Sequence, residues 1–264
     1  MNSLLSLSIQ AALEAGKEIL TVYSGSDFEV DFKSDNSPLT LADRRAHQAI
    51  VNHLNKTSFP VLSEEGRSIP YEERSGWKTF WMVDPLDGTK EFIKRNGEFT
   101  VNIALIESGI PVMGVIYVPV KRTLYFASSD TGSCRVEEVA ADDQRSLEEL
   151  RKAGQKLPVK NGKSSFVVVG SKSHMTPETE TFIGEIRKEH PEAEILSRGS
   201  SLKLCMVAEG AADIYPRFAP TMEWDVAAGH AIARFAGKKV FRHDTGEELR
   251  YNKENLLNPW FIVQ

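Results

Sequence analysis

Apolar residues recur at helical spacing in the first part of the chain. Between residues 3 and 23 they follow one another three or four positions apart, which predicts an amphipathic helix that ends before Gly25. A second helix is predicted to begin near Thr40, because apolar positions up to Leu54 repeat at the same spacing. The polar, turn-rich segment 33–38 between the helices predicts a loop.

The pattern becomes strand-like from Thr79 onwards. Short apolar runs bounded by turn residues predict strands at residues 80–83, 99–106, 112–118 and 123–127. The first of these is expected to end at Asp84. Because the connections between the strands are short, we expect an antiparallel meander that packs against the two helices.

Residues 141–164 are highly charged and have little periodicity, which indicates a surface connection or a domain boundary. Helices and strands alternate beyond it. Strands are predicted at 166–169, 195–196 and 212–215, and helices from Thr176 onwards, at 200–209 and at 224–235. The predicted fold is therefore an α+β half with a meander sheet (1–140) and an α/β half (141–264), packed as a single compact unit.

The charge of the chain restricts its partners. The 264 residues include 32 basic and 37 acidic residues, a net charge of −5. Such a surface does not attract nucleic acid or anionic lipid by its overall field, so we predict neither as a partner. An anionic substrate would need local neutralisation, for which a bound cation is the obvious candidate.

The two cysteines, Cys134 and Cys205, lie far apart and outside any metal-binding spacing. We expect two reduced thiols in a cytoplasmic protein. The N-terminal segment lacks the features of a signal peptide, and no apolar run has the length of a membrane span. We therefore expect no integral membrane segment.

Asp84 and Asp87 flank Pro85-Leu86 just after an apolar strand. A β-turn would explain this string equally well, because proline, glycine and aspartate are turn residues. Two features favour a functional site. Carboxylates at the carboxyl end of a buried strand are common in α/β sites. The following Gly88-Thr89 step can open a helix whose backbone N–H groups face a phosphate.

Two further acids are predicted to lie at the ends of secondary-structure elements. Glu64 follows an apolar pair and Asp225 begins an apolar helix, although a solvated turn and a helix cap would also account for them. Magnesium prefers carboxylate oxygens and water in octahedral geometry. Two such ions, about 4 Å apart, can hold the attacking and leaving oxygens of an in-line displacement. Together with Asp84 and Asp87 these acids would supply the ligands, completed by a peptide oxygen such as that of Leu86.

Four segments in this order resemble the signatures of the inositol monophosphatase superfamily. They are Lys33-x-Asp35-x-Ser37-Pro38-x-Thr40-x-Ala42-Asp43, Ser63-Glu64-Glu65-Gly66, Trp81-Met82-Val83-Asp84-Pro85-Leu86-Asp87-Gly88-Thr89 and Trp224-Asp225-Val226-Ala227-Ala228-Gly229. The resemblance covers essentially the whole chain and implies a layered αβαβα sandwich. The run from Asp84 to Thr100 is similar to the branch of the superfamily that hydrolyses 3′(2′),5′-bisphosphate nucleotides, as are 199–203 and 215–218.

The resemblance implies roles for individual residues. Two or three Mg²⁺ ions would bind Glu64, Asp84, Asp87, Asp225 and the carbonyl of Leu86, with Asp35 near a third, weaker ion. Asp43 with Thr89 would orient and deprotonate the attacking water, assisted by Glu64. A solvated helix acid and a helix cap are the plain alternatives for Asp43 and Thr89. The substrate-binding residues implied in the same way are Gly88, Thr89, His174, Ser200, Lys203, Arg217 and Asp225.

The branch places His174, Ser200, Lys203 and Arg217 near the base, ribose and second phosphate of a nucleotide. Each has a plain structural alternative: a turn residue, a helix cap, a solvated lysine and a surface loop cation, respectively. Peripheral attachment to the inner face of the cell membrane has been associated with the branch, but the net charge of −5 gives it no support.

The implied reaction is direct hydrolysis of adenosine 3′,5′-bisphosphate to AMP and phosphate, in support of sulfate assimilation. No phosphoenzyme is expected, because Asp84 and Asp87 are three residues apart, whereas phosphatases with a nucleophilic aspartate use a DxD pair. Two alternatives remain open. One is an inositol or sugar monophosphatase with the same metal site, and the other is a non-catalytic nucleotide-binding regulator. The oligomeric state does not follow from the sequence.

Overall fold

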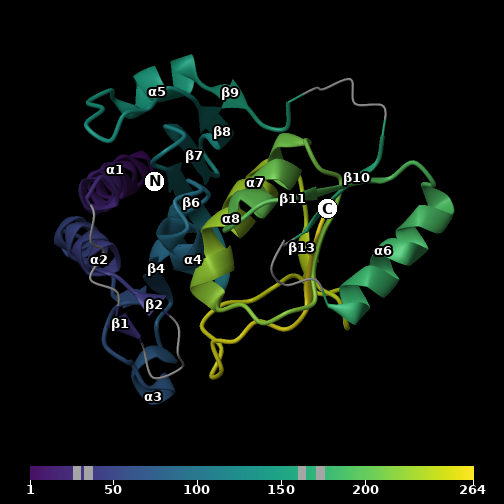
Figure 1. Ribbon diagram of the computed structural model, residues 1–264. Coiled ribbons are helices and arrows are strands. Elements are labelled where there is room, and N and C mark those ends of the chain that lie inside the picture. The colour runs from purple at the N-terminus through teal and green to yellow at the C-terminus, as the bar shows by residue number, and fades with distance from the viewer. Residues whose placement is uncertain (26–30, 33–37, 160–164, 171–175) are drawn as a thin grey trace.

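The computed structural model of the chain describes residues 1–25, 31–32, 38–159, 165–170 and 176–264. Helices α1 (Asn2–Tyr23) and α2 (Leu41–Leu54) pack side by side near the N-terminus (Figure 1). Both match the predicted helices to within a residue or two, and Thr40 caps α2 by accepting from the N–H of Asp43. The two-residue strands β1 (Asp31–Phe32) and β2 (Pro38–Leu39) pair beside them, and residues 33–37 of the predicted loop lie outside the described residues.

A seven-stranded sheet in the order β3-β4-β5-β6-β7-β8-β9 forms the centre of the molecule. Its strands are β3 (Val61–Ser63), β4 (Thr79–Asp87), β5 (Thr100–Glu107), β6 (Ile110–Val118), β7 (Thr123–Ser128), β8 (Gly132–Val136) and β9 (Gln155–Lys156). Strand β3 pairs in parallel with β4, and each of the other neighbouring pairs in this sheet is antiparallel. The strands from β4 onwards form the predicted antiparallel meander.

Both faces of this sheet are covered, because successive side chains of a strand point to opposite faces. On β4, Trp81 and Val83 pack with the core under α1 and α2. Phe80 and Met82, which alternate with them along the strand, pack with the core under α7 (Leu202–Glu209) and α8 (Glu223–Phe235). Burial on both sides explains why the strands read as continuous apolar runs.

Helix α8 approaches the sheet closely where glycine leaves room. A β-carbon added to Gly114 of β6 would lie 2.4 Å from the carbonyl oxygen of Ala228 in α8. One added to Gly229 would lie 2.8 Å from the β-carbon of Leu204 in α7. The backbone of α8 is therefore held between the sheet on one side and α7 on the other.

Two small sheets complete the fold beyond α8. Strands β10 (Val167–Gly170) and β11 (Glu194–Ser197) pair in parallel, and β12 (Tyr215–Arg217), β14 (Phe261–Val263) and β13 (Val240–Arg242) pair antiparallel in that order. Helix α6 (Pro177–Glu189) lies on their outer side (Figure 1). The layers are thus helices, sheet, helices, sheets and helix, as expected for the αβαβα sandwich.

The structure corrects several predicted elements. Residues 141–164 were expected to be a connection, but they include helix α5 (Leu147–Ala153), which Ser146 and Glu149 cap, and strand β9. The strand predicted at 212–215 is β12, three residues later. Strands β13 and β14 and the short helix α3 (Tyr71–Arg74) were not predicted, whereas α4 (Thr89–Ile93) is the helix expected to open at the Gly88-Thr89 step. The boundary at residue 140 stays a prediction, and β9 lies beyond it in the same sheet.

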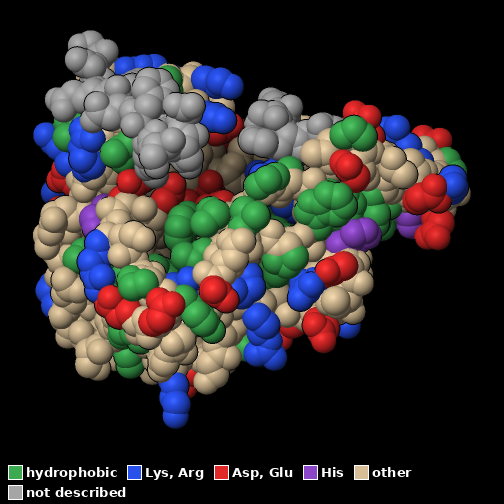
Figure 2. Space-filling view, turned by 90° about the horizontal axis from the view of Figure 1, so that it is seen from below, with side chains coloured by type: hydrophobic (Ala, Val, Ile, Leu, Met, Phe, Trp, Pro, Cys, Tyr) green, Lys and Arg blue, Asp and Glu red, His purple; other side chains and the backbone are tan. Residues whose placement is uncertain are grey.

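Both cysteines are free and buried. None of the helices in the described part of the chain has the length and apolar character required to cross a membrane. On the face seen in Figure 2, side chains of Lys and Arg are interspersed with those of Asp and Glu.

Candidate active site

The predicted acids come together at one end of the central sheet. Glu64 follows β3, and its N–H donates to the carbonyl of Val83 (3.1 Å), which keeps it beside β4. Asp84 and Asp87 both lie within β4, which continues past the predicted end. Asp225 lies in the first turn of α8. Three different elements thus deliver four carboxylates to one place.

A bulge in β4 explains how both of its aspartates reach the site. Asp84 pairs with Asn102 of β5, and Asp87 pairs with Thr100, so three steps on one strand oppose two on the other. The additional residue in the Pro85-Leu86 segment locally changes the direction of β4. The prediction that the strand ends at Asp84 is wrong for this reason: Pro85 lacks a ladder donor, but pairing resumes after the bulge.

Mutual repulsion and burial change the acidity of this cluster. Burial raises the pKa of Asp84 well above its usual range, and the charges of Glu64, Asp87 and Asp225 raise it further. The pKa of Asp225 is raised well above its usual range in the same way, mainly by burial and then by Asp87 and Glu64. The side chain of Glu64 raises the pKa of Asp84 by its proximity as well as by its charge, because two adjacent carboxyl groups favour a proton between them. Such a cluster needs protons or cations for neutrality.

The donor chemistry fits a hard divalent cation, which prefers oxygen ligands. One oxygen of Asp84 accepts from the N–H of Leu86 (3.1 Å), and one of Asp225 accepts from the N–H of Met222 (2.9 Å). These bonds fix the orientation of the two carboxylates. In the described ranges, no three side chains of Asp, Glu, His or Cys already surround one point as a metal site would. The fit to a cation therefore rests on the type and charge of the donors.

Asp43 and Thr89 lie beside the acid cluster and contact each other. The hydroxyl of Thr89 lies 3.2 Å from Asp43 Oδ1, and Asp43 Oδ2 accepts from the backbone N–H of Thr40 (2.7 Å) and from its hydroxyl (2.5 Å). Asp43 is only 2% exposed. Burial raises its pKa to about 6, against the opposing effect of the bonds from Thr40. A carboxylate with this pKa is suited to accept a proton near neutral pH.

Gly88 precedes helix α4 with a φ of 94°, a left-handed conformation that favours glycine. Gly88 and Thr89 line the same cavity. Helix α4, which Thr89 begins, has five residues. Leu86 has its carbonyl oxygen 3.4 Å from the hydroxyl of Thr89. The three residues thus lie together at the turn between β4 and α4.

A network of hydroxyl groups that the sequence did not reveal orients Asp87. Its Oδ2 accepts from the hydroxyls of Ser200 (2.8 Å) and Ser201 (2.7 Å). Ser201 also receives a hydrogen bond from the amide of Asn102 (2.7 Å), and Ser200 lies 2.6 Å from the hydroxyl of Thr100. Ser200 has a φ of 53°, so these bonds hold a strained turn in place. Ser201 lies beside the predicted Ser200, but only the fold shows which residue it contacts.

Two buried cations face the acids across the cavity. The ammonium group of Lys203, which is 5% exposed, donates to the carbonyls of Ser200 (2.5 Å) and Arg198 (3.2 Å) and lies over the ring of Tyr215. Burial lowers its pKa to about 8, although Asp87 acts in the opposite direction. Arg217 donates to the carbonyl of Pro220 (2.9 Å), and its buried Nε has no hydrogen-bond partner among the described residues.

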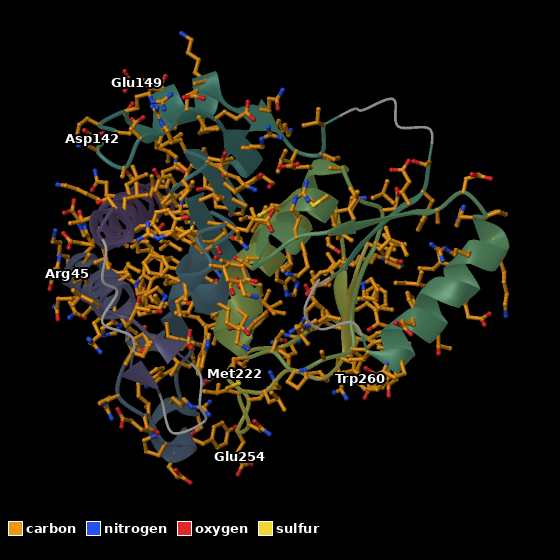
Figure 3. The ribbon with its side chains drawn as sticks, in the orientation of Figure 1. Arg45, Asp142, Glu149, Met222, Glu254 and Trp260 are labelled. Carbon is orange, nitrogen blue, oxygen red and sulfur yellow. The ribbon has the colours of Figure 1, made fainter. Side chains whose placement is uncertain are left out.

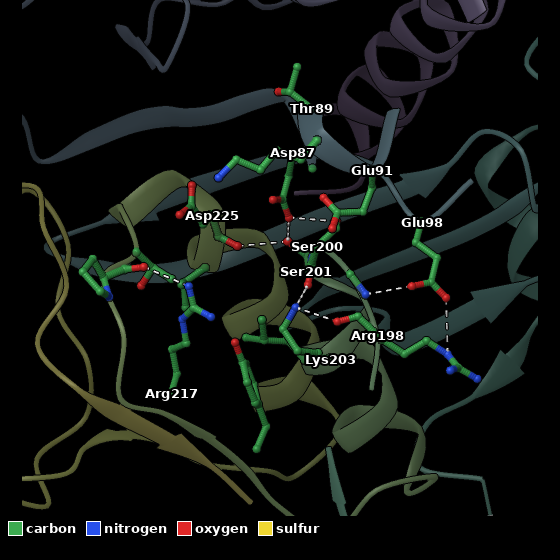
Figure 4. A pocket seen from close by; sticks show the side chains of 18 of the residues that line it. Asp87, Thr89, Glu91, Glu98, Arg198, Ser200, Ser201, Lys203, Arg217 and Asp225 are labelled. Atoms are coloured by element: carbon green, nitrogen blue, oxygen red, sulfur yellow. Dashed lines mark hydrogen bonds and ion pairs between the residues drawn. The ribbon is translucent and has the colours of Figure 1, made fainter. Parts of the chain in front are cut away.

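One cavity of about 320 Å³ is lined by most of these residues: Glu64, Asp87, Gly88, Thr89, Ser200, Ser201, Lys203, Arg217 and Asp225. Asp43, Asp84 and Leu86 are buried and are not among its lining residues. Figure 4 shows Thr89, Asp87 and Asp225 on one side of it and Lys203 and Arg217 on the other. Arg198 and Glu98, which the sequence did not single out, form an ion pair of 3.8 Å at its rim. His174 and Asp35 lie outside the described residues.

Three comparisons place the chain among known proteins. A model of the inositol monophosphatase family matches residues 1–259. The chain is 46% identical over 259 residues to the protein named 3′(2′),5′-bisphosphate nucleotidase CysQ from Salmonella typhimurium, covering 96% of each. The crystal structure of CysQ from Bacteroides thetaiotaomicron aligns with a TM-score of 0.93 and 57% identity, over 100% of this chain and 97% of that one. The extragenic suppressor protein suhB from Bartonella henselae aligns with a TM-score of 0.74 and 27% identity, over 99% and 93% of the two chains.

Proposed function

The chain belongs to the inositol monophosphatase family, and on that basis we propose that it is a magnesium-dependent 3′(2′),5′-bisphosphate nucleotidase. The preferred reaction is hydrolysis of adenosine 3′,5′-bisphosphate to AMP and phosphate. The observation that carries this proposal is the cavity in which buried cations face an acid cluster. The similarity to proteins named as such nucleotidases, over 96% of each chain, supports it further.

Family members are metal-dependent phosphatases, and the acid cluster has suitable donors for the ions. Glu64, Asp84, Asp87, Asp225 and the carbonyl of Leu86 would hold two or three Mg²⁺ ions, and Asp35 is a candidate for the weakest site. Bound Mg²⁺ neutralises phosphate charge and makes water a stronger nucleophile.

Asp43 and Thr89 would manage the proton of the attacking water. The hydroxyl of Thr89 donates to Asp43, so its oxygen remains available to accept a hydrogen bond from water. The water proton passes to Thr89 as the hydroxyl proton passes to Asp43, with Glu64 assisting. The water oxygen attacks phosphorus in line, the bond to the ribose 3′-oxygen breaks, and that oxygen takes up a proton from solvent.

The opposite side of the cavity favours a bisphosphate over a monophosphate. Arg217 has a buried N–H group without a partner among the described residues, which an anionic oxygen would satisfy. Ser200 and Lys203 shape the adjoining wall, where the ribose and base would lie, and Gly88, Thr89 and Asp225 adjoin the scissile phosphate. His174 remains a prediction for the base. An inositol monophosphate has no second phosphate to use these cations.

Cytoplasmic location and a role in sulfur nucleotide turnover belong to the same proposal.

The test is phosphate release by the purified protein. We expect adenosine 3′,5′-bisphosphate with Mg²⁺ to be hydrolysed much faster than inositol 1-phosphate, and EDTA to abolish activity with both. Faster release from inositol 1-phosphate would favour the monophosphatase alternative. Binding of the nucleotide without any Mg²⁺-dependent release would favour the non-catalytic regulator.

A further inference from the structure

Glu223 is a charged residue inside the protein, two positions before Asp225. It is the first residue of α8 and is 0% exposed. Its carboxylate accepts from the N–H groups of Asn252 (2.6 Å) and Lys253 (3.0 Å) and from the ammonium group of Lys253 (2.5 Å). Three donors fix both the position and the orientation of the first turn of α8. The proposed reaction does not use this residue.

Arg74 holds the same segment from the other side. It is 3% exposed and lies in α3. Its guanidinium group donates to Asn252 Oδ1 (2.9 Å) and to the carbonyls of Lys253 (2.7 Å) and Glu254 (2.8 Å). The amide of Asn252 donates back to the carbonyl of Arg74 (2.7 Å). Residues 252–254 are thus bound between Arg74 and Glu223.

Residues 255–258, which follow the segment bound by Arg74 and Glu223, also hold the start of α8. We call the whole stretch 252–258 the C-terminal strap. The N–H of Glu223 donates to the carbonyl of Leu256 (2.9 Å), and the amide of Asn258 donates to the carbonyl of Met222 (2.8 Å). Figure 3 shows Met222 and Glu254 at the same end of the molecule. Met222 in turn donates its N–H to Asp225 Oδ2, so the strap reaches the acid cluster through a single residue.

Arg74 lies in the connection that joins Glu64 to β4. The contacts therefore form a chain from that connection, through Arg74 and the strap, to Glu223 and Asp225. An ion pair with a buried partner, such as that of Glu223 with Lys253, contributes little stability compared with apolar packing. Its directional hydrogen bonds do fix the relative positions of the groups that they join.

We propose that Arg74 and Glu223, acting through the C-terminal strap, are positioning residues that hold Asp225 in register with Glu64 and thereby set the affinity for Mg²⁺. The inference rests on the proposed metal site. Neither residue touches the substrate cavity, so both act through Asp225.

The test measures Mg²⁺ binding by isothermal titration calorimetry, together with thermal unfolding. We expect Glu223→Gln and Arg74→Met each to weaken Mg²⁺ binding roughly 10-fold, the lower range for loss of a residue that orients a metal ligand. Because both act through one strap, the double variant should lose about as much as the worse single variant, rather than the product of the two losses. Saturating Mg²⁺ should restore most of kcat.

Glu248→Gln is the matched control, because Glu248 pairs with His230 and Arg234 farther along the same helix. It should lower the unfolding temperature while leaving Mg²⁺ affinity unchanged. If Arg74→Met does not fold, Arg74→Lys, which keeps the charge but loses the forked geometry, takes its place with a smaller expected loss.

Wild-type Mg²⁺ affinity in Glu223→Gln and in the Arg74 variant would overturn the inference, as would an equal loss in Glu248→Gln. Failure of the wild-type protein to bind Mg²⁺ would instead overturn the proposed function.

Discussion

Thr89 Oγ1 lies 3.2 Å from Asp43 Oδ1, although the two residues are 46 positions apart and belong to different helices. Asp43 is anchored by its bonds to Thr40, so its remaining oxygen is presented to Thr89 in a fixed direction. The pair sits beside the acid cluster and gives the proposed reaction its proton acceptor.

Removal of the Thr89 hydroxyl should affect the reaction more than binding. We expect Thr89→Val, which keeps the shape of the side chain, to lower kcat about 100-fold or more, the usual contribution of a positioned proton-transfer group. KM for adenosine 3′,5′-bisphosphate should change little. Thr89→Ser keeps the hydroxyl and is the control. Equal rates in the two variants would contradict the role of this hydroxyl.

Asp43 should make the metal-free protein less stable as the pH rises. Its pKa is raised from 3.8 to about 6, so the folded state holds this proton more tightly than the unfolded state does. The associated stability is fully present below pH 3.8 and is lost as the pH rises through about 6. Relative to wild type, Asp43→Asn should therefore gain up to about 3 kcal/mol in unfolding free energy over this range. Urea denaturation in EDTA measures the difference, and parallel pH curves would contradict it.

Asp84→Asn should abolish turnover while the fold persists. The substitution keeps an acceptor for the N–H of Leu86 but removes a carboxyl group whose charged form is disfavoured by burial and by the neighbouring acids. We expect the metal-free variant to be at least as stable as wild type. Phosphate release and thermal unfolding measure the two effects, and near wild-type turnover would exclude Asp84 as an essential ligand.

Ser201→Ala should weaken Mg²⁺ binding through Asp87. The substitution removes one of the hydroxyls that orient this carboxylate, and loss of such a contact usually costs about 10-fold or more in metal affinity. Calorimetric titration with Mg²⁺ measures the change. Ser128→Ala, which removes a fully buried hydroxyl in β7, is the control. A similar loss in both variants would point to general destabilisation.

Arg217→Gln should distinguish a bisphosphate from a monophosphate. A hydrogen bond to a charged group contributes about 2 kcal/mol, so KM for adenosine 3′,5′-bisphosphate should rise about 30-fold. KM for 3′-AMP, which lacks the second phosphate, should rise much less. The control is Arg242→Gln, which removes a half-buried cation paired with Asp244. An equal rise in KM for both substrates would show that Arg217 does not recognise the second phosphate.

The regular elements could be predicted from the sequence because their apolar faces are wide. Helix α1 has apolar positions along its whole length, and the strands of the meander are buried on both faces. Helix α5 escaped prediction because it is short and Leu150 is its one buried residue. Strands β13 and β14 have three residues each, too few to show a period.

The site was predictable only where a signature contains its residues. The acids on β4 are three positions apart and could be grouped from the sequence. The contact between Asp87 and Ser201 joins residues 114 positions apart, so only the folded chain brings it to light. Lys203 was expected at the nucleotide, which stays a prediction, and the structure shows that its ammonium group binds the backbone carbonyls of Ser200 and Arg198.

The close contact of Gly114 with Ala228 has a mechanical consequence. Where side chains separate a helix from a sheet, rotamer changes can absorb a shift of a few tenths of an ångström. Here backbone meets backbone, so no side chain can absorb a shift of α8 toward β6. The spacing between the central sheet and α8, the helix that carries Asp225, is therefore fixed at this contact, and the C-terminal strap then orients the first turn of that helix.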